Sequence, residues 1–232
     1  MVSIKNLRKS YKGIQAVAID ELNIYEGEVI GLVGNNGAGK TTFFRLLLDL
    51  IRADGGEILS KGKSVTATED WKSYTAAYID EGFLIEYLTP EEYFYFVGKL
   101  SRQSKADVDD FLAQFSNFFD DAILKKGKYI RDFSKGNQFK IGIVAALLNN
   151  PELLILDEPF ANLDPTSQLR LVDMIKQMAA DRRMCIIVSS HDINHVSEVS
   201  SRIILMEKGS IIKDIAGGEA AYDEMVAYFK VR

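Results

Sequence analysis

The sequence VIGLVGNNGAGKTTFFRLLL, residues 29–48, decides the fold of this chain. Its first five residues are apolar or glycine, which is typical of a short buried strand. Residues 34–41 fit the spacing G-x-x-x-x-G-K-[ST], and residues 42–48 have the apolar character of a helix. A strand, a glycine-rich loop and a helix in this order are the context in which this motif binds phosphate groups. The stretch therefore predicts a nucleotide-binding α/β fold, and a chance glycine-rich turn is the weaker interpretation.

The chemistry of this loop follows from its residue types. Glycines let the backbone wrap closely around an anion and point its amides at phosphate oxygens, and the N-terminus of the following helix adds partial positive charge. We expect Lys40 to reach the β- and γ-phosphates and the Thr41 hydroxyl to bind Mg²⁺. The predicted nucleotide-binding residues are Gly34, Asn35, Asn36, Gly37, Ala38, Gly39, Lys40, Thr41 and Thr42.

Two carboxylates follow a second apolar run. Leu153–Leu156 has the character of a central parallel strand, and it ends at Asp157 and Glu158. Burying two carboxylates at the end of a strand costs free energy unless a cation or a reactive group lies beside them. Open α/β sheets bind ligands at the carboxyl ends of their strands. We expect Asp157 to hold Mg²⁺, through water, and Glu158 to orient or deprotonate the attacking water. Alone, the pattern also fits a solvated turn, but the phosphate-binding loop favours catalysis.

A third apolar strand, residues 186–190, ends at His191. Beside a nucleotide this histidine could hydrogen-bond the γ-phosphate, although a lone histidine is more often structural. His195 follows four residues later, on a predicted helix. This spacing permits a metal pair, but neither a cysteine nor a third histidine supports one. We therefore predict a catalytic role for His191 and none for His195.

The composition is that of a globular protein. The 232 residues are 47% hydrophobic and 26% charged, with a formal net charge of −5. These values exclude a disordered chain, and the single cysteine excludes an internal disulfide framework. A net negative charge does not attract nucleic acid. The basic run at residues 125–128 is too short to suggest a binding site for it. No apolar run approaches the roughly 20 residues of a membrane span, so we expect a cytoplasmic protein that does not bind nucleic acid.

The order of the patterns predicts one domain, residues 1–232, with an insertion. We expect residues 1–81 and 151–232 to form an α/β core, because strand patterns dominate its first part and strands alternate with amphipathic stretches in its second. Residues 82–150 should form a helical insert between the two parts.

The predicted insert is rich in aromatic residues between residues 83 and 119. Thr89-Pro90-Glu91-Glu92 has the form of a helix start, and Gly98 with residues 101–105 predicts a break before a second helix. The aromatic side chains either form the core of the insert or offer a surface to a partner. Their helical periodicity favours the core.

Taken together, these motifs resemble the ATP-binding cassette (ABC) family, the ATPase subunits of ABC transporters. Residues 34–41 match its Walker A loop, and Leu153–Leu156 with Asp157 matches its Walker B strand. Phe133-Ser134-Lys135-Gly136-Asn137 lies where the family has its signature, usually Leu-Ser-Gly-Gly-Gln. The other matches are Glu158 for the catalytic glutamate, Tyr11 for the aromatic that stacks on adenine, Ala161-Asn162-Leu163-Asp164 for the D-loop and His191 for the switch histidine.

The chain departs from this family at two motifs. Its signature has Lys135 and Asn137 but keeps Ser134 and Gly136, which contact the γ-phosphate in the family, and the Ser-Lys-Gly form resembles bacterial exporter ATPases. Glu81 stands where the family has the glutamine of its Q-loop. Glutamate can still bind Mg²⁺ but adds negative charge near the phosphates. We expect activity to be retained; the alternative is slow hydrolysis or a need for more Mg²⁺.

The resemblance implies a fold and a dimer. The fold is an α/β P-loop NTPase core of ABC ATPase type, with an N-terminal antiparallel β subdomain and an inserted α-helical subdomain. In the family, the Walker residues of one subunit face the signature of another across ATP and Mg²⁺, so we expect a homodimer or a heterodimer. The implied metal-binding residues are Thr41, Asp157 and Glu81, the implied catalytic residues are Lys40, Glu158 and His191, and the further nucleotide contacts are Tyr11, Ser134, Gly136 and Asp164.

The resemblance also implies a membrane partner. In transporters of the family, a short cytosolic helix of the membrane subunit docks beside the helical insert. We expect this contact at residues 83–88, through Phe83, Leu84, Tyr87 and Leu88. The implied function is ATP hydrolysis that drives a bacterial membrane transporter, an exporter by its signature, from the cytosolic face of the membrane. The alternatives are a soluble ABC ATPase acting on a cytosolic assembly and a P-loop enzyme of another type, such as a kinase.

Overall fold

A computed structural model of the chain describes residues 1–79, 83–182 and 184–230. Its centre is a six-stranded sheet. The strands of this sheet are β3 (Val29–Val33), β6 (Thr75–Tyr78), β7 (Leu153–Leu156), β8 (Cys185–Ser190), β9 (Arg202–Glu207) and β10 (Ser210–Ala216). Their order in space is β10-β9-β3-β8-β7-β6, and only the pairing of β10 with β9 is antiparallel.

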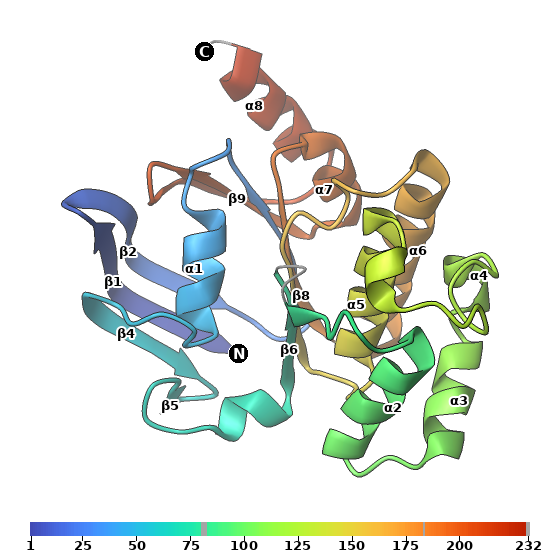
Figure 1. Ribbon diagram of the computed structural model, residues 1–232. Coiled ribbons are helices and arrows are strands. Elements are labelled where there is room, and N and C mark those ends of the chain that lie inside the picture. The colour runs from blue at the N-terminus through green and yellow to red at the C-terminus, as the bar shows by residue number, and fades with distance from the viewer. Residues whose placement is uncertain (80–82, 183, 231–232) are drawn as a thin grey trace.

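A second sheet, entirely antiparallel, lies to one side of the first (Figure 1). Its order is β2-β1-β4-β5. Helix α1 lies between the two sheets, where Phe43 and Phe44 are buried against both of them. These elements span Val2–Tyr11 (β1), Ile14–Ile24 (β2), Gly55–Ser60 (β4), Lys63–Ser64 (β5) and Lys40–Leu47 (α1).

The central strands β3, β7 and β8 are fully buried, and alternate residues along β7 and β8 join different cores. On β8, Cys185 and Ile187 join the core that contains α1, whereas Ile186 and Val188 join the core of the insert. Such a strand is apolar throughout, which is why β3, β7 and β8 appear in the sequence as uninterrupted apolar runs. Burial also raises the pKa of the Cys185 thiol to about 12, so this cysteine stays protonated at neutral pH.

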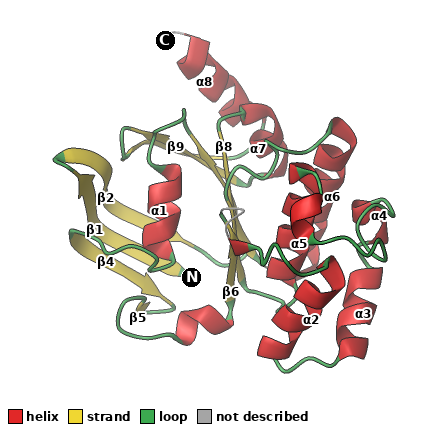
Figure 2. Cartoon of the chain, in the orientation of Figure 1, coloured by secondary structure: helices red, strands yellow, loops and turns green. Residues whose placement is uncertain are grey.

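The remaining helices cover the opposite face and the end of the sheet (Figure 2). The insert supplies α2 (Pro90–Leu100), α3 (Lys105–Ala113), α4 (Ser116–Phe119) and α5 (Lys135–Leu147), and the last part of the chain supplies α6 (Pro165–Arg182), α7 (Ile193–Val199) and α8 (Glu219–Lys230). Short 3-10 helices lie at Asp70–Ser73 and Ile130–Asp132. Among the described residues, no helix combines the length and the apolar character that crossing a membrane requires.

The predicted helix start at Thr89 is confirmed, because Thr89 and Glu92 form a reciprocal capping box at the start of α2. The predicted break before a second helix is confirmed at residues 101–104, but Gly98 is not part of it. Gly98 lies inside α2, where a Cβ atom would come within 2.5 Å of the Val108 side chain on α3. The glycine serves close helix packing, and the break itself falls between α2 and α3.

Helix α5 is the element that ties the insert to the sheet. It packs against β6 and β7, and its residue Gly142 lies directly over Tyr78 at the end of β6. A Cβ atom on Gly142 would come within 1.9 Å of the Tyr78 ring, so only glycine allows this approach. Tyr78 also makes an edge-to-face contact with Phe139 of α5, with ring centroids 4.8 Å apart, which strengthens the packing of α5 on β6.

The predicted fold class is confirmed: an α/β core with an N-terminal antiparallel sheet and an inserted helical part. The predicted division at residues 81 and 82 lies outside the described residues, so the exact domain limits remain a prediction. The predicted parallel βα units after residue 151 correspond to β7-α6-β8 and β8-α7-β9.

Candidate active site

The phosphate-binding loop connects β3, whose five residues are all buried, to the first turn of α1. Gly37 and Gly39 have φ angles of +81° and +106°, which L side chains rarely adopt. A Cβ atom on Gly39 would also come within 2.4 Å of the Ala16 carbonyl oxygen. Gly39 caps α1 without a side-chain hydrogen bond, so the first-turn amides are left for a ligand. The loop is shaped for an anion at the helix N-terminus.

Lys40 supplies the cation of this loop. Its side chain is only 6% exposed, and its Nζ atom donates a hydrogen bond of 2.6 Å to the Gly34 carbonyl oxygen. The same ammonium lies 3.1 Å from Glu158 Oε1, an ion pair that brings the loop and the end of β7 together. The chain thus holds the predicted phosphate-binding lysine against the predicted catalytic carboxylate.

Asp157 lies beside Thr41 at the end of β7. Thr41 Oγ1 donates a hydrogen bond of 2.5 Å to Asp157 Oδ2, and Ser189 Oγ donates one to Asp157 Oδ1. Burial raises the pKa of the Asp157 carboxyl, and the hydrogen bonds from Ser189 and Thr41 oppose this shift without cancelling it. The hydrogen bonds thus do not fully offset the burial of this carboxylate. A carboxylate oxygen beside a hydroxyl oxygen is a pair of ligands that a hard cation prefers. The residues present therefore fit Mg²⁺.

A site of this kind contains few protein ligands. Across the described ranges, no group of three or more His, Cys, Asp and Glu side chains is arranged to hold a metal ion. Magnesium is usually held by one or two protein oxygens together with substrate phosphates, so the pair formed by Thr41 and Asp157 is sufficient. Glu81, the third predicted metal-binding residue, lies outside the described residues.

Glu158 is fixed from three sides. Its backbone has a φ angle of +48°, in the left-handed region, and its amide donates a 2.9 Å hydrogen bond to Ser189 Oγ. Its Oε2 atom lies 2.8 Å from His191 Nδ1 and accepts a hydrogen bond of 3.3 Å from the His191 amide. With Lys40 on Oε1, the carboxylate is held between a cation and an imidazole.

Ser189 is a residue of this site that the sequence analysis did not find. Its hydroxyl donates to Asp157 Oδ1 and accepts from the Glu158 amide, so it joins both carboxylate residues to β8. The available signal was its place near the end of an apolar strand, two residues before His191. Fully buried serines at such a position usually hydrogen-bond a neighbouring strand end.

A cavity of about 220 Å³ opens where these groups meet, and a second one of about 370 Å³ lies on the other side of the loop. Tyr11, the predicted adenine-stacking residue, is about half exposed at the end of β1 and is not among the described residues that line either cavity. The first cavity is lined by Ala16, Asn36, Gly37, Ala38, Gly39, Lys40, Thr41, Thr42 and Glu158, and the second by Gly34, Asn35, Asn36, Gly37, Ala38, Leu205, Met206, Glu207, Lys208 and Tyr228.

The signature-like segment lies elsewhere. Ser134 is exposed and caps α5 by accepting a hydrogen bond of 3.3 Å from the Asn137 amide. A Cβ atom on Gly136 would come within 2.6 Å of the Asn162 carbonyl oxygen. Helices α5 and α1 pack on opposite faces of the six-stranded sheet (Figure 1), and neither Ser134 nor Gly136 is among the described residues that line the two cavities at the loop. Asp164 caps α6 through Ser167, whose hydrogen bonds lower the pKa of the Asp164 carboxyl.

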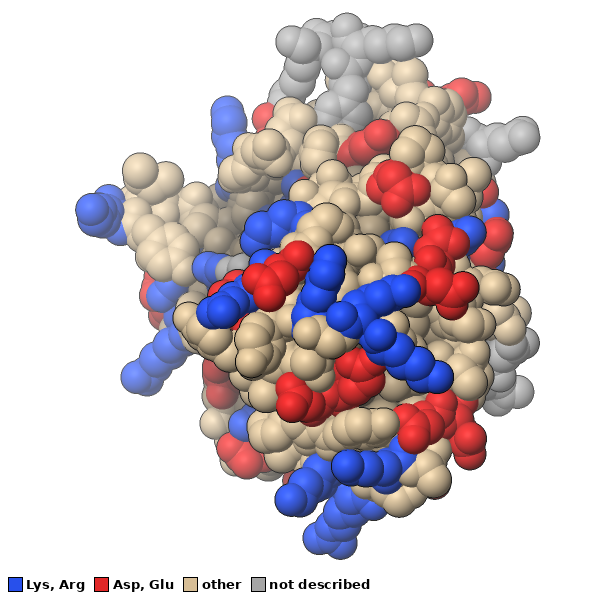
Figure 3. Space-filling model, turned by 45° about the vertical axis from the view of Figure 1, so that its right-hand side comes forward, with Lys and Arg blue, Asp and Glu red and all other residues tan. Residues whose placement is uncertain are grey.

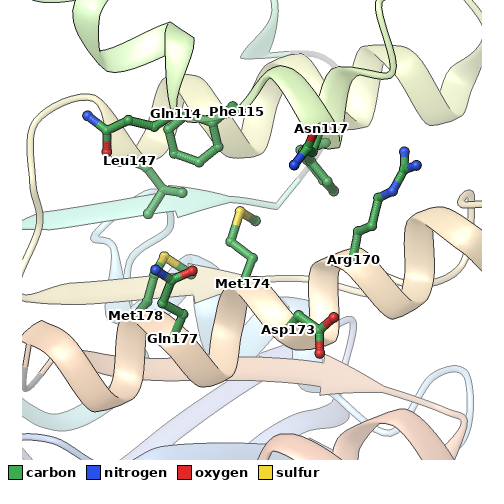
Figure 4. Close-up of a pocket in the computed structure, with 10 residues that line it drawn as sticks. Gln114, Phe115, Asn117, Leu147, Arg170, Asp173, Met174, Gln177 and Met178 are labelled. Atoms are coloured by element: carbon green, nitrogen blue, oxygen red, sulfur yellow. The ribbon is translucent and has the colours of Figure 1, made fainter.

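Another cavity, of about 350 Å³, lies in the seam between the insert and α6 (Figure 4). Its walls are mainly aromatic, aliphatic and thioether side chains, such as Phe115 and Met174, with amide groups at the rim. Its cation, Arg170, is already paired with Asp120 at 2.8 Å. This cavity contains neither a glycine-rich loop nor a carboxylate pair, so we place the chemistry at the loop.

The charged side chains are mixed over the face that Figure 3 displays, where lysine and arginine alternate with aspartate and glutamate. Exposed ion pairs also occur among the described residues, such as the one that joins Lys176 to Glu198 at 2.8 Å. This mixed pattern differs from the continuous basic stripe that nucleic-acid-binding proteins present.

Comparison with known proteins gives a consistent result. A family model described as "ABC transporter" matches residues 18–161. The ABC transporter ATP-binding protein YhcH of Bacillus subtilis is 32% identical over 240 residues, which cover 99% of this chain and 74% of that protein. MJ1023 of Methanocaldococcus jannaschii, named in the same way, is 32% identical over 213 residues, or 91% of this chain and 76% of that protein.

Solved structures share the fold. The structure of an ATP-binding subunit of an ABC transporter matches with a TM-score of 0.83 and 25% identity, covering 100% of this chain and 94% of that one. The cassette MJ0796, solved as a dimer bound to ADP and Pi, matches with a TM-score of 0.82 and 24% identity over 93% of this chain and 98% of that one.

Proposed function

This chain belongs to the ABC transporter family and is an ABC ATPase, the ATP-binding subunit of a transporter; we propose that it drives export through the ATP-dependent pairing of two copies. The observation that carries the proposal is one connected cluster of five residues: Lys40, Thr41 and Glu158 line one small cavity, Asp157 is hydrogen-bonded to Thr41, and His191 contacts Glu158. The export direction is supported by the Ser-Lys-Gly form of the signature at residues 134–136.

In hydrolysis, the carboxylate of Glu158 would act as the general base. This group accepts a proton from the water molecule that attacks the γ-phosphate, and the bond to the β-phosphate oxygen breaks to release ADP. Phosphate oxygens attract Lys40 Nζ away from Glu158 Oε1, which leaves that oxygen free to act as the base. His191 keeps its contact with Oε2 and holds the carboxylate in place.

Magnesium has a defined place in this scheme. Thr41 and Asp157 would hold the ion, with Glu81 as a further proposed ligand outside the described residues. When bound, Mg²⁺ would neutralise charge that develops on the phosphates. Around it, the loop residues and Thr42 would bind the phosphates, and Tyr11 would stack on adenine.

The signature supports pairing of two copies. The first turn of α5 contains no acidic residue, and its N-terminus is exposed at Ser134, which makes it a suitable anion site. Since this terminus lies on the other face of the sheet from the chain's own loop, we propose that Ser134 and Gly136 contact the γ-phosphate bound to a second subunit. Asp164 would lie at the same interface. Two identical chains would then form two complete sites.

The membrane subunit would dock on the segment between β6 and α2. Phe83 is 56% exposed and Tyr87 is 69% exposed, whereas Leu84 is buried and cannot contribute directly. The Arg131 guanidinium lies 4.7 Å from the centre of the Tyr87 ring, and backbone hydrogen bonds from residues 130 and 131 to Leu88 and Glu86 hold the segment. A firmly held surface of exposed aromatics is suited to the apolar face of an amphipathic helix. This contact would keep the protein at the cytosolic face of the membrane.

We expect the double variant Phe83→Ser, Tyr87→Ser to lose its membrane partner. The test isolates a tagged Glu158→Gln protein from detergent-solubilised membranes with ATP present, with and without these two changes. Tyr25→Ser is the matched control, because Tyr25 is 59% exposed outside the insert.

The proposal expects a multi-spanning membrane protein at about equal stoichiometry with the parent and with Tyr25→Ser, and its loss with the double variant. Recovery with cytosolic partners alone would overturn the transporter role in favour of a soluble ABC ATPase. Retention of the membrane protein by the double variant would overturn only the docking surface.

A further inference from the structure

Helix α7 brings both histidines of the chain to the segment that follows β7. His191, just before the helix, contacts Glu158, and His195, one turn later, stacks on Phe160 with ring centroids 4.8 Å apart and an interplanar angle of 28°. We propose that His195 is a positioning residue for hydrolysis, which holds the backbone that carries Glu158 by stacking on Phe160. This inference rests on the proposed function of Glu158 and adds a residue for which the sequence predicted no role.

The segment needs such support because Glu158 is in the left-handed region, with a φ angle of +48°. A residue with a Cβ atom stays there only when its surroundings over-determine the conformation. The backbone amide of Glu158 is fixed by Ser189 at 2.9 Å. Further along, the Phe160 carbonyl accepts a hydrogen bond of 2.9 Å from Gln168 Nε2, and the Phe160 ring is 3% exposed. His195 adds a contact on the ring itself.

The helix that carries His195 is itself rigidly seated. A Cβ atom on Gly31 would come within 2.0 Å of Val196 Cγ1, so α7 lies directly on β3 at the strand that leads into the phosphate-binding loop. The Asp192 side chain caps the helix by accepting a hydrogen bond of 2.9 Å from the Asn194 amide. His191 precedes this helix and His195 lies within it, so their two contacts flank its first turn. One rigid element therefore fixes both the side chain of Glu158 and the chain two residues beyond it.

Loss of the stack would affect the chemical step and not nucleotide binding. His195 is not among the described residues that line the cavity at the loop, and it touches neither Lys40 nor Thr41 in the described part of the chain. A small displacement of a general base is enough to slow a reaction that depends on its alignment with the attacking water. We therefore expect a lower kcat with an unchanged KM for ATP.

The experiment compares His195→Leu, which keeps the bulk of the side chain without a ring, with His195→Phe, which keeps a ring. Steady-state ATPase assays should give a three- to tenfold lower kcat for His195→Leu, a KM within twofold of wild type, and a kcat within twofold of wild type for His195→Phe. Ser197→Ala is the control on the same helix, since its hydroxyl donates to the Asn194 carbonyl within that helix. Melting temperatures show whether each variant folds.

Further results decide whether the proposal holds. Phe160→Leu combined with His195→Leu should be no slower than the slower single variant, because both changes remove the same contact. A His195→Leu protein with the wild-type kcat, or a His195→Phe protein as slow as His195→Leu, would overturn the positioning role while leaving the ATPase proposal in place. A wild-type protein without ATPase activity would overturn both.

Discussion

Replacement of Glu158 by glutamine should lower ATP turnover by about 10²–10⁴-fold, the range for loss of a general base. An amide has the size of the carboxylate and can keep the contact with His191, which is 2.8 Å away, but it cannot accept the proton of the attacking water. Nucleotide binding should persist, because the loop and Lys40 are unchanged. ATP that cannot be hydrolysed should then hold two subunits together, and light scattering on a sizing column should detect the ATP-dependent dimer.

Glu152 provides the control for this variant. It lies at the opposite end of β7, where it pairs with Lys61 at 2.6 Å on the surface. Glu152→Gln should hydrolyse ATP at the wild-type rate. A Glu158→Gln protein that keeps the wild-type rate would remove Glu158 from the mechanism, and one that stays monomeric in saturating ATP would contradict the pairing of two copies.

Replacement of Lys40 by alanine should weaken ATP binding by about 10- to 100-fold, since a hydrogen bond to a charged group contributes about 1.5–3 kcal/mol. Turnover should fall by a further 10²–10³-fold, because the ammonium no longer stabilises the charge that develops on the phosphates. The variant also leaves Glu158 Oε1 without its cation. Titration with a fluorescent ATP analogue and a steady-state ATPase assay measure the two effects separately.

Lys208 is the matched control, because it lines the second cavity beside the same loop. Lys208→Ala should bind ATP within about twofold of wild type if the effect of Lys40 depends on direct contact. Equal losses in the two variants would mean that the loop attracts ATP only through the general positive potential around it.

The sequence was sufficient for the parts of the site that local patterns determine. The glycines in residues 34–41 predict a backbone that wraps closely around an anion, and Gly37 and Gly39 have φ angles of +81° and +106°, which L side chains rarely adopt. The ends of β7 and β8 lie together because parallel strands carry their carboxyl ends to one edge of the sheet. The proximity of Glu158 and His191 therefore followed from two short apolar runs.

The remaining contacts depend on register and packing, which the sequence does not state. Leu156 pairs with Val188, and this register sets Ser189 beside Asp157. A shift of one residue would turn its hydroxyl to the other face. The stack of His195 on Phe160 likewise depends on where α7 lies on β3. No spacing rule connects residues 160 and 195.

The aromatic residues of the insert show the limit of periodicity. Phe94, Phe118 and Phe119 are buried, as the helical spacing predicts, but Phe83 and Tyr87 are exposed. The two exposed residues precede α2, so they belong to no helical stripe. Periodicity identifies a helix face but not the side chains of a loop, and these are the residues that offer a surface to a partner.

A site shared between two subunits can be tested by mixing two variants that are each expected to be inactive, Lys40→Ala and Ser134→Asp. Aspartate can cap α5 as serine does but places a negative charge where the γ-phosphate of a second subunit would lie. Each variant alone should show almost no ATPase activity. In a mixed pair, the intact loop of one chain meets the intact signature of the other, so activity should appear on mixing. A Ser134→Asp protein that hydrolyses ATP at the wild-type rate by itself would show that one chain completes its own site, and would contradict the account.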